Sequence, residues 1–425
     1  MSRLARIVPA LAALVCGALA GRVLWSPVPD DFIGGESALP AVLVANGAGV
    51  ACAGVIAVLV TVALTRRRSV TLVAATALAG LLLLMLPDVW LYPEDPAVLL
   101  YSNAVGAGLV LAAISPLAAR DRNSQAGLAA GAVSAFLLSA AYAEVRGFRA
   151  ADFGWTAYTP LTSRAPVEQS GVVGLWLVVV AAVLVVLAVL LDRGTSWTGR
   201  VDTRWLAVAV ALPVAAFAAN WILIESEARP EWWYPYVGVT VALVAWVAWQ
   251  LPGRDGQVVF AGAAVLAAAV GGTPWMSTEW WALAIPAALI MVGLVVGLRW
   301  PVPAVGFGLL AITAAVLLVD PESSSDVPAI AYMFLLPVAA GYAVGSCLPA
   351  SAPAATVGLS LPFTVGIPGV VATAWTMTGR YADYAPASVF ERSASVSVPA
   401  ALAAVAVIVV CGVGAWGLEL RSGAR

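Results

Sequence analysis

Residues 66–87, RRRSVTLVAATALAGLLLLMLP, place three consecutive arginines directly before a run that contains no charged side chain. An α-helix needs about 20 apolar residues to cross the hydrocarbon core of a bilayer, and the run that begins at Ser69 has about this length. The rest of the chain has a similar composition, because 62% of its 425 residues are hydrophobic and only 10% are charged. Soluble proteins have about 25% charged residues. The sequence therefore predicts an all-α, polytopic integral membrane protein.

Apolar runs of similar length follow one another along the chain, with mostly short connections between them. We expect about 14 transmembrane helices arranged as antiparallel hairpins, in one domain that covers residues 1–425 and leaves no room for a soluble domain. Two longer loops, residues 146–170 and 376–395, are expected on the outer side. The predicted spans are residues 7–25, 38–64, 69–87, 97–118, 126–145, 171–191, 205–225, 234–251, 258–272, 279–298, 301–319, 328–347, 353–375 and 396–418.

The arginines decide the predicted orientation. If the N-terminus is cytoplasmic, the connections on the inner side carry 14 of the 21 arginines, and 18 of the 23 acidic residues lie on the outer side. Cytoplasmic loops carry an excess of basic residues, so we expect both termini in the cytoplasm. The absence of lysine and the richness in alanine and valine indicate a GC-rich bacterial genome, and hence the plasma membrane. The first span ends in Ala18-Leu19-Ala20, which is similar to a signal-peptidase site, but we expect this helix to remain uncleaved.

One local similarity suggests internal repetition. The second span begins Pro40-Ala41-Val42-Leu43 and the fourth begins Pro96-Ala97-Val98-Leu99. Duplicated hairpins are one interpretation, and chance similarity between apolar segments is the other. Fourteen spans could also divide into halves 1–225 and 226–425, as inverted repeats do in many transporters, although the residues of these two halves do not match.

The predicted spans contain almost no ionisable residues, and the chain has no histidine and no lysine. Intramembrane carboxylates usually mark ion and proton pathways, so their scarcity argues against a proton site near the middle of the membrane. The thirteenth span, PAATVGLSLPFTVGIPGVVATAW (residues 353–375), contains three prolines and three glycines. We expect this helix to be broken and its middle to face the bundle interior. Polar residues in spans can either line a path or bond to a neighbouring helix. The candidate substrate-path residues are Asn46, Asn103, Asn220, Ser360, Pro362, Thr364 and Pro368.

Acidic residues and tryptophans gather at the predicted outer boundary, where they could form a vestibule. Most of these acids can also be explained as groups that stabilise the first turns of helices, and the tryptophans as an interfacial belt. The candidate vestibule residues are Glu144, Glu225, Trp232, Trp233, Trp280 and Trp281.

These features favour a permease or flippase-like transporter subunit for a hydrophobic, lipid-linked or weakly cationic compound. No phosphate-binding loop occurs in the chain, so we expect a partner to supply energy, for example an associated ATPase. Membrane lipid and further membrane subunits are the other expected partners, whereas no nucleic acid, cofactor or metal is expected. A non-catalytic subunit or scaffold of a membrane complex is an alternative.

A third hypothesis is that the protein is a membrane enzyme that builds the cell envelope, although we expect that it is not an enzyme. Asp30-Asp31, in the first outer loop, resembles the acidic pair in the first outer loop of polytopic glycosyltransferases that use polyprenyl-phosphate sugars. This resemblance implies that one carboxylate acts as a base or a metal ligand.

Overall fold

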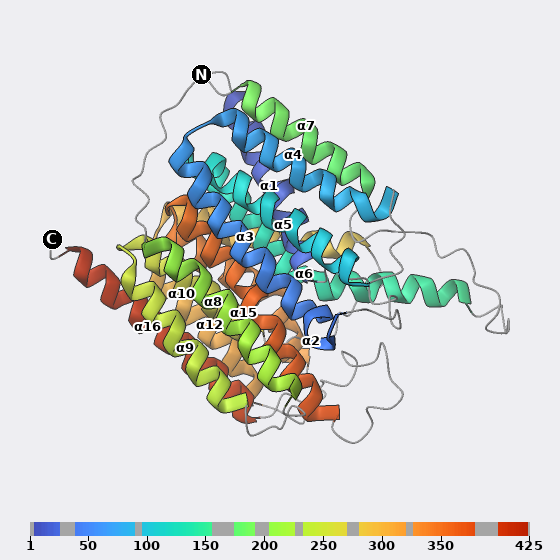
Figure 1. Cartoon of the computed structure of the whole chain (residues 1–425). Helices are drawn as coiled ribbons and strands as arrows, with labels where there is room; N and C mark the ends of the chain where they lie inside the picture. The colour runs from blue at the N-terminus through green and yellow to red at the C-terminus, as the bar shows by residue number, and fades with distance from the viewer. Residues whose placement is uncertain are drawn as a thin grey trace.

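The computed structural model describes residues 4–25, 39–89, 96–154, 174–191, 204–225, 233–269, 280–319, 326–378 and 398–423. In these ranges the chain forms antiparallel helices joined by tight turns, with no strand (Figure 1). The helices of the first part of the chain are α1 (Leu4–Trp25), α2 (Ala41–Val44), α3 (Asn46–Arg67), α4 (Val70–Val89), α5 (Pro96–Ala118), α6 (Arg122–Gly154), α7 (Leu175–Leu190), α8 (Arg204–Glu225) and α9 (Trp233–Gln250).

The remaining helices complete the bundle. They are α10 (Arg254–Ala269), the 3₁₀-helix η2 (Trp280–Leu283), α11 (Ala284–Arg299), α12 (Pro303–Val319), α13 (Asp326–Ile330), the π-helical turn η3 (Ala331–Leu335), α14 (Leu336–Cys347), α15 (Ala352–Thr378) and α16 (Val398–Gly423).

The predicted fold class is confirmed, since each of the predicted spans coincides with a helical segment once α2–α3, η2–α11 and α13–η3–α14 are joined. Among the described residues, six helices are long and apolar enough to cross a membrane by length and composition, and further apolar helices are shorter. With the composition of the chain, this makes it a multi-pass membrane protein.

The expected break in the thirteenth span is wrong. Helix α15 continues through Pro362 and Pro368, because neighbouring helices can compensate a transmembrane helix for the hydrogen bonds that proline removes. Its predicted position is confirmed over residues 352–365, all of which are buried. The second span is interrupted instead: Ala45 is extended, with ψ of 142°, and separates α2 from α3. There the Tyr101 hydroxyl donates a hydrogen bond to the Leu43 carbonyl at 2.8 Å.

The helices pack as two sets with one repeated scheme. We define the first helix set as α1, α3, α4, α5, α6 and α7, and the second helix set as α10, α11, α12, α14, α15 and α16. In the first set, α1 packs on α5, α6 and α7, and α4 packs on α5 and α7, while α3 packs on α5. In the second set, α10 packs in the same way on α14, α15 and α16, and α12 on α14 and α16, while α11 packs on α14.

Helices α8 and α9 lie outside this scheme. Helix α8 packs on α3 and α15, one helix from each set, and α9 packs on α10, α15 and α16 (Figure 1). The predicted boundary at residue 225 falls between α8 and α9, so the first helix set lies within residues 1–225 and the second within residues 226–425. The division of the chain into two repeated halves stays a prediction.

Pairs of glycines four residues apart form the tightest helix contacts. A Cβ atom added to Gly131 of α6 would lie 2.1 Å from the carbonyl oxygen of Leu14 in α1, and one on Gly127 would lie 2.3 Å from that of Ala10. Helices α11 and α14 meet in the same way at Gly293 and Gly341, where the distances to the opposing carbonyl oxygens are 2.1 and 2.2 Å. Small residues allow backbones to approach closely, which is the main source of helix association in lipid.

We expect Gly131→Ala to destabilise the protein by about 1–3 kcal/mol, because a methyl group at this point pushes α6 away from α1. Thermal unfolding of the purified protein in detergent measures the effect. Gly308→Ala is the matched control, since no atom lies within 4 Å of the added Cβ and alanine is the better helix former. Equal melting temperatures for the two variants would contradict this account of the α1–α6 contact.

Candidate functional site

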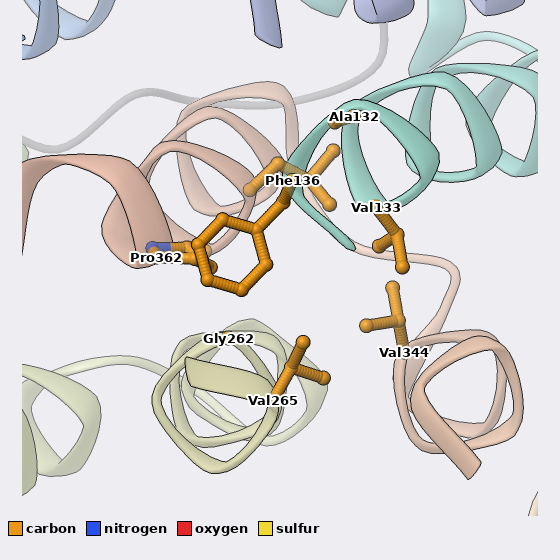
Figure 2. Close-up of a pocket in the computed structure, with 9 residues that line it drawn as sticks. Ala132, Val133, Phe136, Gly262, Val265, Val344 and Pro362 are labelled. Carbon is orange, nitrogen blue, oxygen red and sulfur yellow. The ribbon is translucent and has the colours of Figure 1, made fainter. Parts of the chain in front are cut away.

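A small apolar cavity lies where helix α6 of the first set meets α10, α14 and α15 of the second. Its volume is about 10 Å³, which is about the space that one water molecule requires. Figure 2 shows the Phe136 ring extending from α6 toward Pro362 and α10. The cavity is lined by Ala132, Val133, Phe136, Gly262, Val265, Val344, Gly358, Leu359 and Pro362.

Helices α10 and α15 cross at the edge of this cavity. A Cβ atom on Gly262 would lie 2.2 Å from the Gly358 carbonyl oxygen, and one on Gly358 would lie 2.8 Å from the Val258 carbonyl oxygen. Pro362 has no N–H to donate to the Gly358 carbonyl four residues before it. The Gly358 carbonyl therefore lacks its usual helical partner, and it lies at the α10–α15 crossing against Gly262.

An aromatic ladder joins the two helix sets beside the cavity. The rings of Trp25 in α1 and Phe136 in α6 meet edge to face, with centroids 5.7 Å apart. Phe136 meets Phe363 of α15 in the same way at 5.3 Å and an interplanar angle of 85°. Such pairs contribute about 0.5–1.5 kcal/mol beyond their burial. The ladder fixes the position of Phe136 in the cavity wall.

Buried hydroxyl groups form a second link between the sets, where α15 packs on α3. The hydroxyl oxygens of Thr61 and Thr356 lie 3.3 Å apart. Each hydroxyl oxygen also lies within hydrogen-bond distance of a carbonyl of its own helix, Thr61 of Ala57 at 2.6 Å and Thr356 of Ala352 at 2.8 Å. This link is polar but carries no charge.

Helix α8 packs on both helices of this link, and α9 packs on α15. The methyl group of Thr364 and the ring of Pro213 in α8 both lie against Gly54 of α3, at 2.8 and 3.2 Å from an added Cβ. The Tyr236 hydroxyl of α9 donates to the Val365 carbonyl of α15 at 2.8 Å. The two helices outside the repeated scheme thus close the α3–α15 contact laterally.

The buried polar side chains that the structure describes are all uncharged. They are Thr61, Thr65, Asn103, Ser115, Ser124, Gln125, Ser139, Gln257, Thr313, Ser346, Thr356, Ser360 and Thr364. Across the same part of the chain there is no group of three or more His, Cys, Asp or Glu residues that could hold a metal ion.

The structure brings one predicted substrate-path residue, Pro362, into the cavity wall. Ser360 and Thr364 are also buried in α15, where their hydroxyls lie 3.3 Å from carbonyls of their own helix. Asn103 is buried in α5, whereas Asn46 is half-buried at the start of α3. The role of these four residues in a path stays a prediction.

Most of the predicted vestibule lies outside the described part. Trp281 is described and its side chain is 67% exposed, as expected for the interfacial alternative. Asp30, Asp31 and Trp232 fall outside the described residues, and the side chains of Asn220, Pro368, Glu144, Glu225, Trp233 and Trp280 are likewise not described.

Among the residues of the cavity wall, only Pro362 was a candidate predicted from the sequence. Phe136, Val133 and Val265 are ordinary apolar residues of their spans, and nothing in their composition marks them. A signal was present in the glycines, since Gly127 and Gly131 have the four-residue spacing of transmembrane helix contacts and point to α6 as a closely packed helix.

We expect Phe136→Ala to lower stability by up to about 3–5 kcal/mol, because it removes a buried ring and enlarges the adjacent cavity. Phe217→Ala is the control: Phe217 pairs with Trp221 at 5.9 Å in α8 but does not line the cavity. Thermal unfolding in detergent compares the two. A smaller loss for Phe136→Ala than for Phe217→Ala would show that the ladder does not hold the helix sets together.

No family model and no curated protein matches the chain. Its structure is similar to that of a bacterial homologue of the human lysosomal transporter Spinster, in an inward-facing and unoccupied conformation, with 15% identity over 100% of this chain and 98% of the other and a TM-score of 0.47. The Major Facilitator Superfamily transporter FucP, in an outward conformation, is similar at 15% identity over 97% and 99% of the two chains, with a TM-score of 0.44. A variant of the E. coli fucose:proton symporter FucP gives 16% identity over the same shares and a TM-score of 0.42.

Proposed function

We propose that the protein is a permease or flippase-like transporter for a hydrophobic, lipid-linked or weakly cationic compound. The observation that carries the proposal is the apolar cavity between α6 of the first helix set and α10, α14 and α15 of the second. Binding sites between helices of a bundle are a common arrangement. In the present conformation the cavity holds no more than a water molecule, so a substrate requires the two sets to move apart.

The chemistry of the boundary favours such a substrate. The residues that line the cavity are apolar, and the α3–α15 link is made by the hydroxyls of Thr61 and Thr356. An apolar molecule suits this wall, and one hydrogen-bond donor or a weak positive charge on it suits the hydroxyl oxygens between α3 and α15. A strongly charged solute would lose its hydration there without an opposite charge in return.

We propose further that energy comes from a partner or from an existing gradient of the substrate. The support is the uncharged character of every described buried polar side chain, because proton-coupled carriers use intramembrane carboxylates or histidines. An associated ATPase is the partner that we favour.

The charge distribution supports a position in the plasma membrane with both termini in the cytoplasm. The connections between α3 and α4, α5 and α6, and α9 and α10 have arginines in them or at the adjacent helix ends, such as Arg66, Arg120 and Arg254. We call this end of the bundle the arginine-rich face, and we propose that it is cytoplasmic.

Transport by the purified chain in liposomes tests the proposal, with ethidium and a fluorescent polyprenyl phosphate as probes. We expect protein-dependent movement of one of them. Val133→Phe, which fills the cavity, should reduce the rate to that of empty liposomes because an overpacked site cannot admit a ligand. Val183→Phe, on the exposed face of α7, is the control with the same chemical change and should keep the rate.

Two outcomes would count against the transport proposal. One is no protein-dependent movement of either probe by a protein that is monodisperse after reconstitution. The other is equal transport by Val133→Phe and Val183→Phe, which would place the path away from the cavity.

For a moving probe, we expect the chain alone to equilibrate it across the membrane without accumulating it, even when a pH gradient is imposed. The physical reason is the absence of Asp, Glu, His, Lys and Arg among the described buried side chains. Probe concentrations inside and outside the liposomes, with and without the gradient, decide the matter. Accumulation that depends on the pH gradient would contradict energy supply by a partner and would indicate proton coupling.

A further inference from the structure

The turn between α14 and α15, residues 348–351, is held by side chains from both helix sets at the arginine-rich face. From α10 in its own set, Arg254 donates to the Leu348 carbonyl at 2.8 Å. Asp255 accepts hydrogen bonds from the backbone N–H and the hydroxyl of Ser351, both at 2.7 Å. These three bonds make the turn a rigid part of the second helix set.

A side chain of the first helix set, Gln125, also bonds to this turn. Gln125 of α6 donates from Nε2 to the Ala350 carbonyl at 2.6 Å, and its Oε1 accepts from the Ala350 N–H at 3.1 Å. Gln125 and Ala350 are 3% and 8% exposed. Both backbone groups of Ala350 are thus satisfied by one side chain across the boundary between the sets, and separation of the sets would leave all four groups without these partners.

A second bond across the boundary starts one helical turn earlier on α6. Arg122 donates to the Leu298 carbonyl near the end of α11. Residues three apart lie on the same face of a helix, so Arg122 and Gln125 together bind one edge of the second set. The arginine is exposed, in contrast to the buried glutamine.

The same helix reaches the cavity. Phe136 lies eleven residues beyond Gln125 on α6, which corresponds to about 16 Å along the helix axis. This is about half of the hydrocarbon thickness. Helix α6 therefore contacts the second set at the arginine-rich face through hydrogen bonds and at mid-depth through the cavity wall.

We propose that the Gln125–Ala350 pair, supported by the Arg122–Leu298 bond, is a releasable latch that closes the cavity toward the arginine-rich face. Release separates the first turns of α6 from the rigid 348–351 turn and opens a way to the cavity from this side. The hydrogen bonds are uncharged or exposed, so water can replace them when the sets part. The inference rests on the proposed transport function, but its test needs no substrate.

The chain contains a matched control for Gln125. Helix α10 begins Arg254-Asp255-Gly256-Gln257, and α6 begins Arg122-Asn123-Ser124-Gln125, so each glutamine is the fourth residue of its helix. Gln257 is 4% exposed, and its Nε2 donates to the Ala415 carbonyl of α16 at 3.1 Å. Both α10 and α16 belong to the second helix set. The two glutamines therefore share type, depth and burial, and differ in whether their bond crosses the boundary.

The experiment measures access to the cavity with a thiol reporter, V133C. N-ethylmaleimide is added to the purified full-length protein in detergent, and the labelled peptides are quantified by mass spectrometry over time. We expect Q125A to raise the labelling rate at position 133 by about fivefold or more, the effect of one net hydrogen bond on an opening equilibrium. Q257A should leave the rate unchanged. The native thiols of Cys16 and Cys411, buried inside the first and the second set respectively, are internal references that should stay protected in all variants.

Equal labelling of position 133 in the Q125A and Q257A proteins would overturn the latch, and so would a parallel increase at Cys16 and Cys411, which would indicate general loosening. If Q125A is not monodisperse, R122A provides the test, because the exposed arginine can be removed without leaving a buried cavity. An unchanged rate in R122A would then overturn the proposal. Faster labelling of Q125A together with a failed transport assay would retain the latch and reject the transport function. Unchanged labelling of Q125A together with successful transport would reject the latch and retain the transport function.

Discussion

The close approach of helix backbones is the constraint on which this structure depends. Lipid tails are as apolar as leucine side chains, so burial of apolar surface contributes little to the association of the helices. Van der Waals contact between closely packed helices must supply the stabilisation instead. At Gly131 between α6 and α1, and at Gly293 and Gly341 between α11 and α14, carbonyl oxygens lie where a Cβ atom would otherwise be. These contacts are inside one helix set or the other. They make each set a tightly packed unit, against which the contacts between the sets can be compared.

The boundary between the sets is built differently. Its described contacts are an aromatic ladder through Phe136, a pair of threonine hydroxyls, and the hydrogen bonds of Arg122 and Gln125. Helix α15 combines several roles in successive residues, because Gly358 packs on α10, Thr356 contacts α3, and Phe363 reaches α6. A helix that meets three neighbours in this way must present a different side chain in each direction. This explains the polar, glycine-containing and proline-containing character of its sequence without a break in the helix.

The sequence was sufficient for the positions of the helices but not for their neighbours. Hydropathy and proline placement predicted every span, since each depends only on local composition. Phe136 could not be identified in advance, because its importance arises from Trp25 and Phe363, which lie far away in the chain. Proline patterns in α15 predicted burial correctly and a break wrongly, because a single sequence shows the missing N–H of Pro362 but not the helix packing that compensates for it. The role of the candidate asparagines in a substrate path stays a prediction for the same reason. A side-chain amide in a span has the same local sequence whether it faces a path or a neighbouring helix.

The two glutamines at the arginine-rich face show how far local sequence can mislead about function. Gln125 and Gln257 follow an arginine by three residues, begin helices of similar position and are equally buried. One donates to a carbonyl in its own helix set, and the other pairs with Ala350 across the boundary. A bond inside a rigid unit contributes only to stability, whereas the same bond between two units also sets the equilibrium of their separation. The chemical groups are identical, so the difference in role must come from the packing scheme that assigns α6 to one set and the 348–351 turn to the other.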